Sequence, residues 1–70
     1  MKKYITKNYK DALDAYSSYI DFNPNDIGVL IKIARIYEQQ QIIDGANFIY
    51  NRIVEIDPSH EIALQKLSNH

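Results

Sequence analysis

The chain contains no cysteine, which excludes disulfide bonds and thiolate metal sites. It is also short, and a core built from 70 residues contributes only about 3–5 kcal/mol of stability. Domains of this size usually add a disulfide, a metal ion or a partner chain. Stacking of repeats, a partner or self-association therefore remain as the expected sources of further stability.

A strong charge of one sign is absent too. The chain has eight lysines and arginines and nine acidic residues, for a net charge of -1. Four of the basic residues lie in the first ten positions, where a solvated helix face explains them better than a binding patch: Lys2, Lys3, Lys7 and Lys10. Since nucleic-acid binders carry a clear basic excess, we expect no nucleic-acid partner.

Long apolar runs are missing as well. No stretch approaches the ~20 residues that a membrane-spanning helix needs, and no apolar stretch follows the first lysines as in a secretory signal. We therefore expect no membrane partner and an intracellular, cytoplasmic location.

Proline is scarce, and its two positions indicate a repeat. Pro24 and Pro58 lie 34 residues apart. The same offset superposes two further pairs, Ala12 on Ala46 and Tyr16 on Tyr50. A fixed period between 20 and 50 residues is typical of stacked supersecondary units.

Apolar residues recur at spacings of three and four in four segments, which predicts four helices. We expect them over residues 9–22, from 27 to the polar run 39–41, over about 44–56, and from 60 onward. The predicted inward positions are Ala12, Leu13, Tyr16, Tyr19 and Ile20; Ile27, Leu30, Ile31, Ala34 and Tyr37; Ala46, Ile49, Tyr50, Ile53 and Ile56; and Ile62, Ala63, Leu64 and Leu67. Asn25 or Asp26 is expected to cap the second helix, and Ser59 the fourth. The short connections make neighbouring helices antiparallel, so the fold class is all-α.

These positions resemble the tetratricopeptide repeat, which has a 34-residue period. The first-helix motif is matched by Leu30, Ile33, Ala34 and Tyr37, and the second by Ala46, Tyr50 and Pro58. The preceding repeat is matched by Ala12, Tyr16 and Pro24. The resemblance implies a right-handed stack of antiparallel helical hairpins, part of an α-solenoid. It assigns residues 27–60 to one complete repeat, 1–26 to a partial repeat and 61–70 to the start of a following or capping helix.

The resemblance also implies packing roles. Ala34 and Ala46 would lie where paired helices approach most closely, and Tyr37 and Tyr50 would fill the space between hairpins. Two departures stand out. Leu30 occupies the place where tryptophan is commonest, and both Lys7 and Gln41 stand where the family favours glycine.

A protein-binding function follows from the resemblance, because stacked hairpins form a concave surface that takes a peptide or a partner helix. The groove-facing positions would be Gly28, Ile31, Arg35, Glu38 and Gln39 of the complete repeat, and Ile62, Gln65 and Asn69 of the following helix. The Lys and Asn set with which some members grip chaperone tails is not assembled here. The RNA-binding pentatricopeptide relatives, with a 35-residue period, are disfavoured by the spacing and the balanced charge.

Nothing in the sequence indicates catalysis or a cofactor. His60 and His70 lack an evident set of further metal ligands, and neither a phosphate-binding glycine loop nor a nucleophile with a base is recognisable. We expect a module that is not itself an enzyme, with a docking domain of a larger enzyme as one alternative.

Self-assembly is the other alternative. In the repeat register, the chain begins inside one first helix and stops inside another. It is expected either to be a segment of a longer solenoid or to form a head-to-tail homo-oligomer, in which residues 3–6 of one copy extend residues 62–69 of the next.

Overall fold

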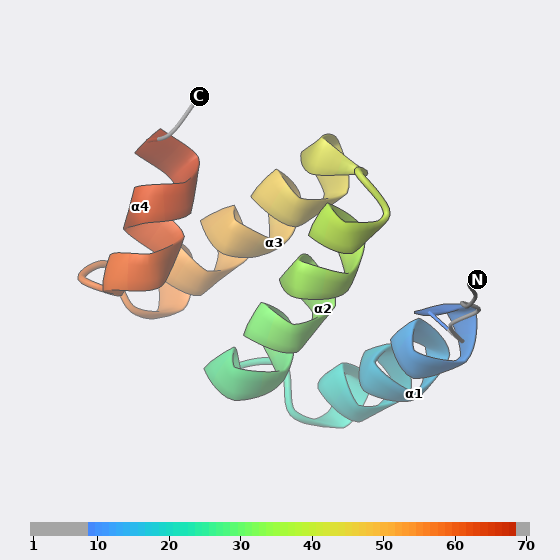
Figure 1. Cartoon of the computed structure of the whole chain (residues 1–70). Helices are drawn as coiled ribbons and strands as arrows, with labels where there is room; N and C mark the ends of the chain where they lie inside the picture. Colours follow the sequence, from blue (N-terminus) through green and yellow to red (C-terminus); the bar gives the residue numbers. More distant parts are fainter. Residues whose placement is uncertain (1–8, 69–70) are drawn as a thin grey trace.

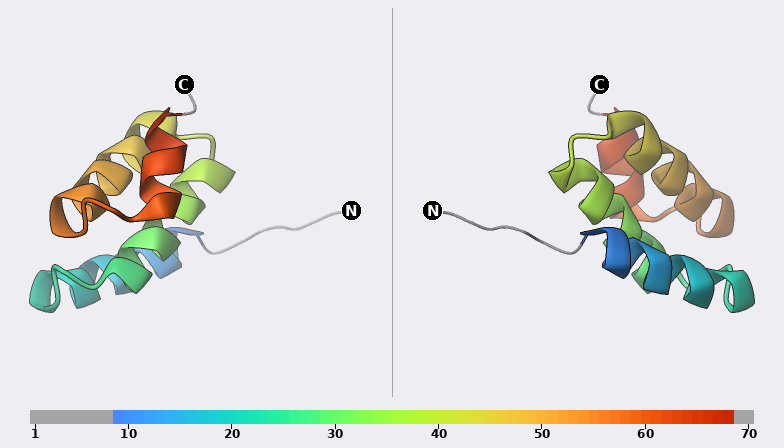
Figure 2. Two further views of the ribbon diagram at one scale, coloured as in Figure 1. Left: turned by 90° about the vertical axis from the view of Figure 1, so that its left-hand side faces the viewer. Right: turned by 90° about the vertical axis from the view of Figure 1, so that its right-hand side faces the viewer.

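The computed structural model describes residues 9–68, which form four α-helices and no strand. The helices are α1 (Tyr9–Phe22), α2 (Ile27–Gln39), α3 (Ile43–Ile56) and α4 (Glu61–Ser68). They follow one another in sequence order, with α1 at one end of the molecule and α4 at the other (Figure 1, Figure 2). Each helix packs against its neighbour in the chain, most extensively α2 against α3. The predicted all-α class is confirmed for the described residues.

The turn between α1 and α2 is held by Asp26. Its Oδ1 accepts a hydrogen bond of 3.2 Å from the amide of Val29, which makes it the N-cap of α2. Its Oδ2 accepts a second bond, of 2.8 Å, from the hydroxyl of Tyr19. Of the two caps the sequence allowed, the structure therefore uses Asp26, and this one carboxylate links the end of α1 to the start of α2.

The turn between α2 and α3 closes through Gln41, whose φ of 64° is in the left-handed region. The amide of Gln41 donates to the carbonyl of Glu38 (2.9 Å), and that of Ile42 to the carbonyl of Tyr37 (2.8 Å). This is the hydrogen-bond pattern that ends a helix with a left-handed residue, usually glycine. The left-handed conformation at this position is one that glycine adopts most easily, although the residue in this chain is glutamine.

The predicted cap of α4 was wrong by one residue. The helix begins at Glu61, so the N-cap position belongs to His60, whose Nδ1 accepts a hydrogen bond of 3.3 Å from the amide of Ala63. Ser59 instead donates both its amide (3.2 Å) and its hydroxyl (3.1 Å) to Oδ1 of Asp57. Ser59 is drawn into this preceding turn because a carboxylate two residues earlier accepts both of its donors.

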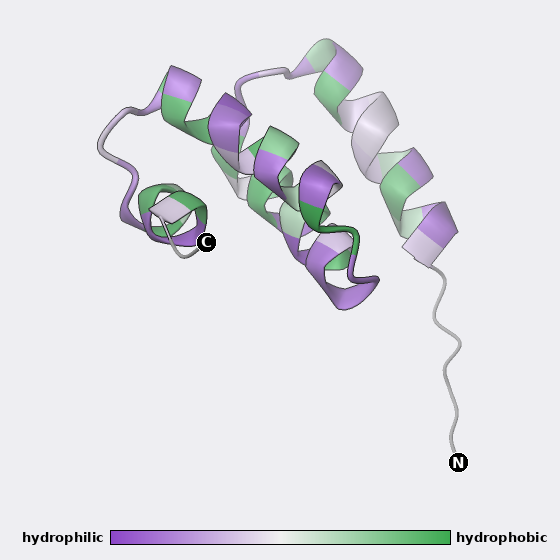
Figure 3. Cartoon of the chain, turned by 90° about the horizontal axis from the view of Figure 1, so that it is seen from above, coloured by the Kyte–Doolittle hydropathy of each residue, from purple (hydrophilic) through white to green (hydrophobic). Residues whose placement is uncertain are grey.

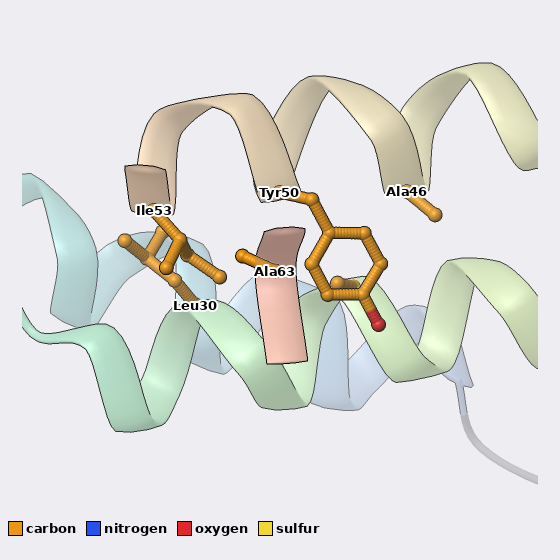
Figure 4. Packing of buried hydrophobic residues seen from close by; sticks show 6 residues of the cluster. Leu30, Ala46, Tyr50, Ile53 and Ala63 are labelled. Atoms are coloured by element: carbon orange, nitrogen blue, oxygen red, sulfur yellow. The ribbon is translucent and has the colours of Figure 1, made fainter. Parts of the chain in front are cut away.

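Three helices supply the core. Its buried cluster contains Leu30 and Ala34 of α2, Ala46, Tyr50 and Ile53 of α3, and Ala63 of α4 (Figure 4). The predicted close-packing alanines are confirmed as buried, with Ala34 at 0% and Ala46 at 2% exposure. Half-buried apolar residues, Tyr37 among them, pack around this cluster.

The first helix, α1, contributes no buried residue. Its predicted inward residues Ala12, Leu13, Tyr16 and Ile20 are half-buried at most. Figure 3 shows the middle of α1 as pale, in contrast to the strongly apolar segments of α2 and α3. A helix with so few large aliphatic side chains forms a looser contact with α2.

Three predicted inward residues are exposed: Ile62 at 38%, and Tyr19 and Leu64 at 44% each. Tyr19 and Leu64 hold positions whose counterparts 34 residues away, Ile53 and Leu30, are buried at 0% and 3% exposure. A side chain at one of these positions is buried only where a further helix packs over it. Among the described residues, none packs over that side of α1 or of α4.

Candidate partner-binding surface

The predicted groove residues of α2 lie on one side of the helix, because their spacings of three and four bring them to the same face. Arg35 and Gln39 are exposed, whereas Ile31 and Glu38 are half-buried. Ile31 packs against the core cluster, so that only part of its side chain can reach a ligand. We call this side of α2, together with the exposed residues Ile62 and Gln65 of α4, the candidate surface.

Glu38 marks the edge of the candidate surface beside α4. Its Oε2 lies 3.3 Å from Nζ of Lys66 on α4, and it accepts a hydrogen bond of 3.1 Å from the hydroxyl of Tyr50 on α3. The carboxylate is thus already engaged by two neighbours. Its role in the structure is to join three helices, which makes it a poorer contact for a partner than the sequence predicted.

Burial and the neighbouring Glu38 change the ionisation of Tyr50. Burial, followed by the charge of Glu38 and the hydrogen bond to it, raises the pKa of Tyr50 to about 12. The phenol donates its hydrogen bond to the carboxylate, and the raised pKa keeps it protonated above pH 10, where an ordinary phenol would ionise. Sequence reasoning assigned Tyr50 only to packing, and it did not single out Lys66, because no local spacing relates residues 28 positions apart.

Gln39 marks the opposite edge, beside α1. Its Oε1 accepts a hydrogen bond from the hydroxyl of Tyr9. Around the axis of α2, Arg35 lies between these two edges. Within the part of the chain that the structure describes, Arg35 takes part in no ion pair. Its exposed guanidinium is therefore available for a charge-assisted contact.

The residues predicted on α4 extend the surface only in part. Ile62 is 38% exposed and Gln65 is exposed, so both are accessible. The ion pair between Glu38 and Lys66 brings α4 next to α2 at this edge. The eighth predicted position, Asn69, lies outside the described residues.

Other kinds of site can be judged over the same part of the chain. No group of three or more histidine, aspartate or glutamate side chains among residues 9–68 is arranged to hold a metal ion. His60 is used as a helix cap, and His70 lies outside the described residues. None of the helices in this range has the length and apolar character required to cross a membrane.

Comparison with known proteins adds no relative. The chain matches no model of a protein family, no curated protein and no solved structure.

Proposed function

We propose that the chain is a tetratricopeptide-like repeat module that binds an extended peptide or a partner helix on the candidate surface of α2 and α4. The observation that supports this proposal is the burial of three signature positions of the repeat. Ala34, Ala46 and Tyr50 are 0%, 2% and 1% exposed, and they come from the paired helices α2 and α3. A short repeat of this kind leaves the outer side of its first helices free for ligands.

The chemistry of the surface suggests a ligand with a carboxylate and apolar neighbours. Glu38 and Lys66 neutralise each other at one edge, so the charge left at the centre is that of Arg35. A guanidinium can hold a carboxylate through two parallel hydrogen bonds. Ile62 supplies exposed apolar area on the neighbouring helix. An acidic side chain or a free carboxyl terminus, flanked by aliphatic residues, fits this arrangement.

Selection from a displayed peptide library, followed by fluorescence anisotropy of the enriched peptides, tests the proposal. Enriched peptides should carry a carboxylate near aliphatic residues. The Arg35→Glu variant should weaken their binding by roughly tenfold or more, since it replaces a charge-assisted contact with repulsion. Arg52→Glu is the matched control, because Arg52 is an exposed arginine on α3 away from the candidate surface.

Two outcomes would contradict the proposal. One is an unchanged affinity of Arg35→Glu, which would remove Arg35 from the contact. The other is an equal loss for Arg35→Glu and Arg52→Glu, which would indicate that only net charge matters. The proposal assigns no catalysis to the chain; a docking role within a larger enzyme remains a prediction from the sequence.

A further inference from the structure

The 34-residue offset relates two apolar stripes that have different surroundings. On α3, Ala46 and Ile53 are 2% and 0% exposed, and Ile49 and Ile56 pack against the core cluster. These four residues recur at helical spacing and so form one stripe, on a helix that packs against both α2 and α4. Figure 4 shows Ile53 of this stripe beside Leu30 of α2.

Within the part of the chain that the structure describes, no helix covers the corresponding stripe on α1. The residues 34 positions earlier are Ala12, Ala15, Tyr19 and Phe22, which we call the α1 stripe. Ala15 is exposed, Tyr19 is 44% exposed and Phe22 is 85% exposed. Ile20 of α1 packs against the core cluster from another side of the helix, and within the stripe the hydroxyl of Tyr19 donates to Asp26 at the start of α2. Ala12 is half-buried, and within residues 9–68 the other three residues of the α1 stripe stay accessible while α1 packs against α2.

A matching open face exists on α4. On α2, Leu30 and Ala34 are buried under α3, at 3% and 0% exposure. Their counterparts 34 positions later are Leu64, which is 44% exposed, and Ser68, which is also exposed. We call these two residues the α4 face. Ala63 and Leu67 pack on another side of α4, against the core, so the α4 face is accessible as well.

The molecule thus carries both halves of an α2·α3-type contact, one at each end (Figure 1). We propose that the α1 stripe of one copy packs on the α4 face of a second copy, in the way that α3 packs on α2 within the chain. The intermolecular contact continues the stacking already established between α2, α3 and α4. It places Tyr19 of one copy against Leu64 of the next, as Ile53 lies beside Leu30. This inference is independent of the peptide-binding proposal, although both use the 34-residue period.

Because the two faces differ and lie at opposite ends, the contact is heterologous. Copies joined in this way add head to tail, into a filament or a closed ring, and do not stop at a symmetric dimer. The contact is also small, since α4 has only eight residues. Stable interfaces bury about 1,600 Å², which is more than so short a helix can contribute. We therefore expect a dissociation constant in the micromolar to millimolar range.

The test is sedimentation equilibrium of the whole chain across a hundredfold concentration range. The average mass should start near the monomer value of 8.2 kDa and rise without a plateau at the dimer. Phe22→Asp removes the α1 stripe and Leu64→Asp the α4 face, and each should weaken association by roughly tenfold or more. Phe48→Asp is the matched control, since Phe48 is 72% exposed on α3 and belongs to neither face.

Mixing the two variants identifies the geometry. A Phe22→Asp copy keeps its α4 face and a Leu64→Asp copy keeps its α1 stripe, so an equimolar mixture should form one contact and stop at a dimer. Circular dichroism confirms that each variant is folded. A wild-type mass that stays at 8.2 kDa throughout, a mixture that remains monomeric, or an equal effect of Phe48→Asp would each overturn the proposal.

Discussion

The hydroxyl of Tyr50 and the ammonium group of Lys66 meet at the same oxygen, Oε2 of Glu38, at 3.1 Å and 3.3 Å. Each of the three residues belongs to a different helix, so this oxygen connects α2, α3 and α4. The connection lies directly beside the buried cluster, in which the ring of Tyr50 is 1% exposed.

This contact predicts instability at high pH. The pKa of Tyr50 is raised from 10.0 to about 12, chiefly by burial, so the folded chain retains a proton that the unfolded chain releases. The stabilisation is complete below pH 10 and is lost as the pH rises from 10 through about 12. The difference in melting temperature between wild type and Tyr50→Phe, followed by circular dichroism, should change over that range. Melting curves of the two proteins that shift in parallel with pH would contradict the prediction.

The ion pair between Glu38 and Lys66 should show measurable coupling. Their side chains are 29% and 44% exposed, so solvent screens the charges only in part. A double-mutant cycle to alanine, measured by urea unfolding, should give a coupling energy near the upper end of the surface range, about 0.5–1 kcal/mol. Lys10 and Asp14 provide the comparison: their side chains are 88% and 72% exposed and 3.9 Å apart, and should couple less. Equal coupling in the two pairs would be the contrary result.

Replacing Gln41 with glycine should stabilise the chain. A side chain at φ 64° is strained, and glycine adopts this conformation without that cost. We expect Gln41→Gly to raise the free energy of unfolding by about 1 kcal/mol, measured in urea. Gln40→Gly is the control, because Gln40 has an ordinary φ of -86° and glycine there should destabilise. If Gln41→Gly were as harmful as Gln40→Gly, the left-handed conformation would be in error.

Enlarging Ala46 should destabilise the contact between α2 and α3. Ala46 is 2% exposed and belongs to the buried cluster, so the larger side chain in Ala46→Leu must displace packed neighbours. We expect a loss of about 1–3 kcal/mol. The same substitution at the exposed Ala15, measured at low concentration, should have little effect. Overlapping melts of Ala46→Leu and wild type would contradict the assigned register.

The pKa of the Asp26 carboxyl group should depend on the hydrogen bonds of the α1–α2 turn. The hydrogen bond from Tyr19, and next the amide of Val29, hold the pKa of Asp26 below its usual 3.8. The cap is therefore fully formed above pH 3.8 and is lost as the pH falls through the lowered value. Tyr19→Phe should move the pKa of Asp26 upward in an NMR titration, whereas Tyr16→Phe should leave it unchanged. No response to Tyr19→Phe would exclude the hydrogen bond in solution.

Local patterns predicted most of the fold. The bounds of α1, α2 and α3 follow from apolar spacing together with Pro24, Pro58 and the glutamine run, which act within a few residues of themselves. The burial of Ala34 and Ala46 follows from the repeat register, since small residues recur where helices approach closely. The cap of α4 was missed because Asp57 competes for Ser59, and this competition depends on turn geometry.

The candidate surface was less predictable. The register brings Arg35, Glu38 and Gln39 to one side of α2, but it cannot show that Glu38 is engaged by Tyr50 and Lys66. Nor does apolar spacing reveal whether a partner helix is present. Periodicity marks Tyr19 and Leu64 as inward, and their exposure depends on what packs outside them.

The lack of buried residues on α1 has a consequence for the local stability of that helix. Among the four described helices, α1 contacts only α2, so it can detach without disrupting the cluster shared by the other three. Local opening of this kind requires much less free energy than global unfolding. In native-state hydrogen exchange, the amides of α1 should therefore exchange through a local opening of low free energy. The amides around Tyr50 and Ile53 should exchange only when the whole chain unfolds.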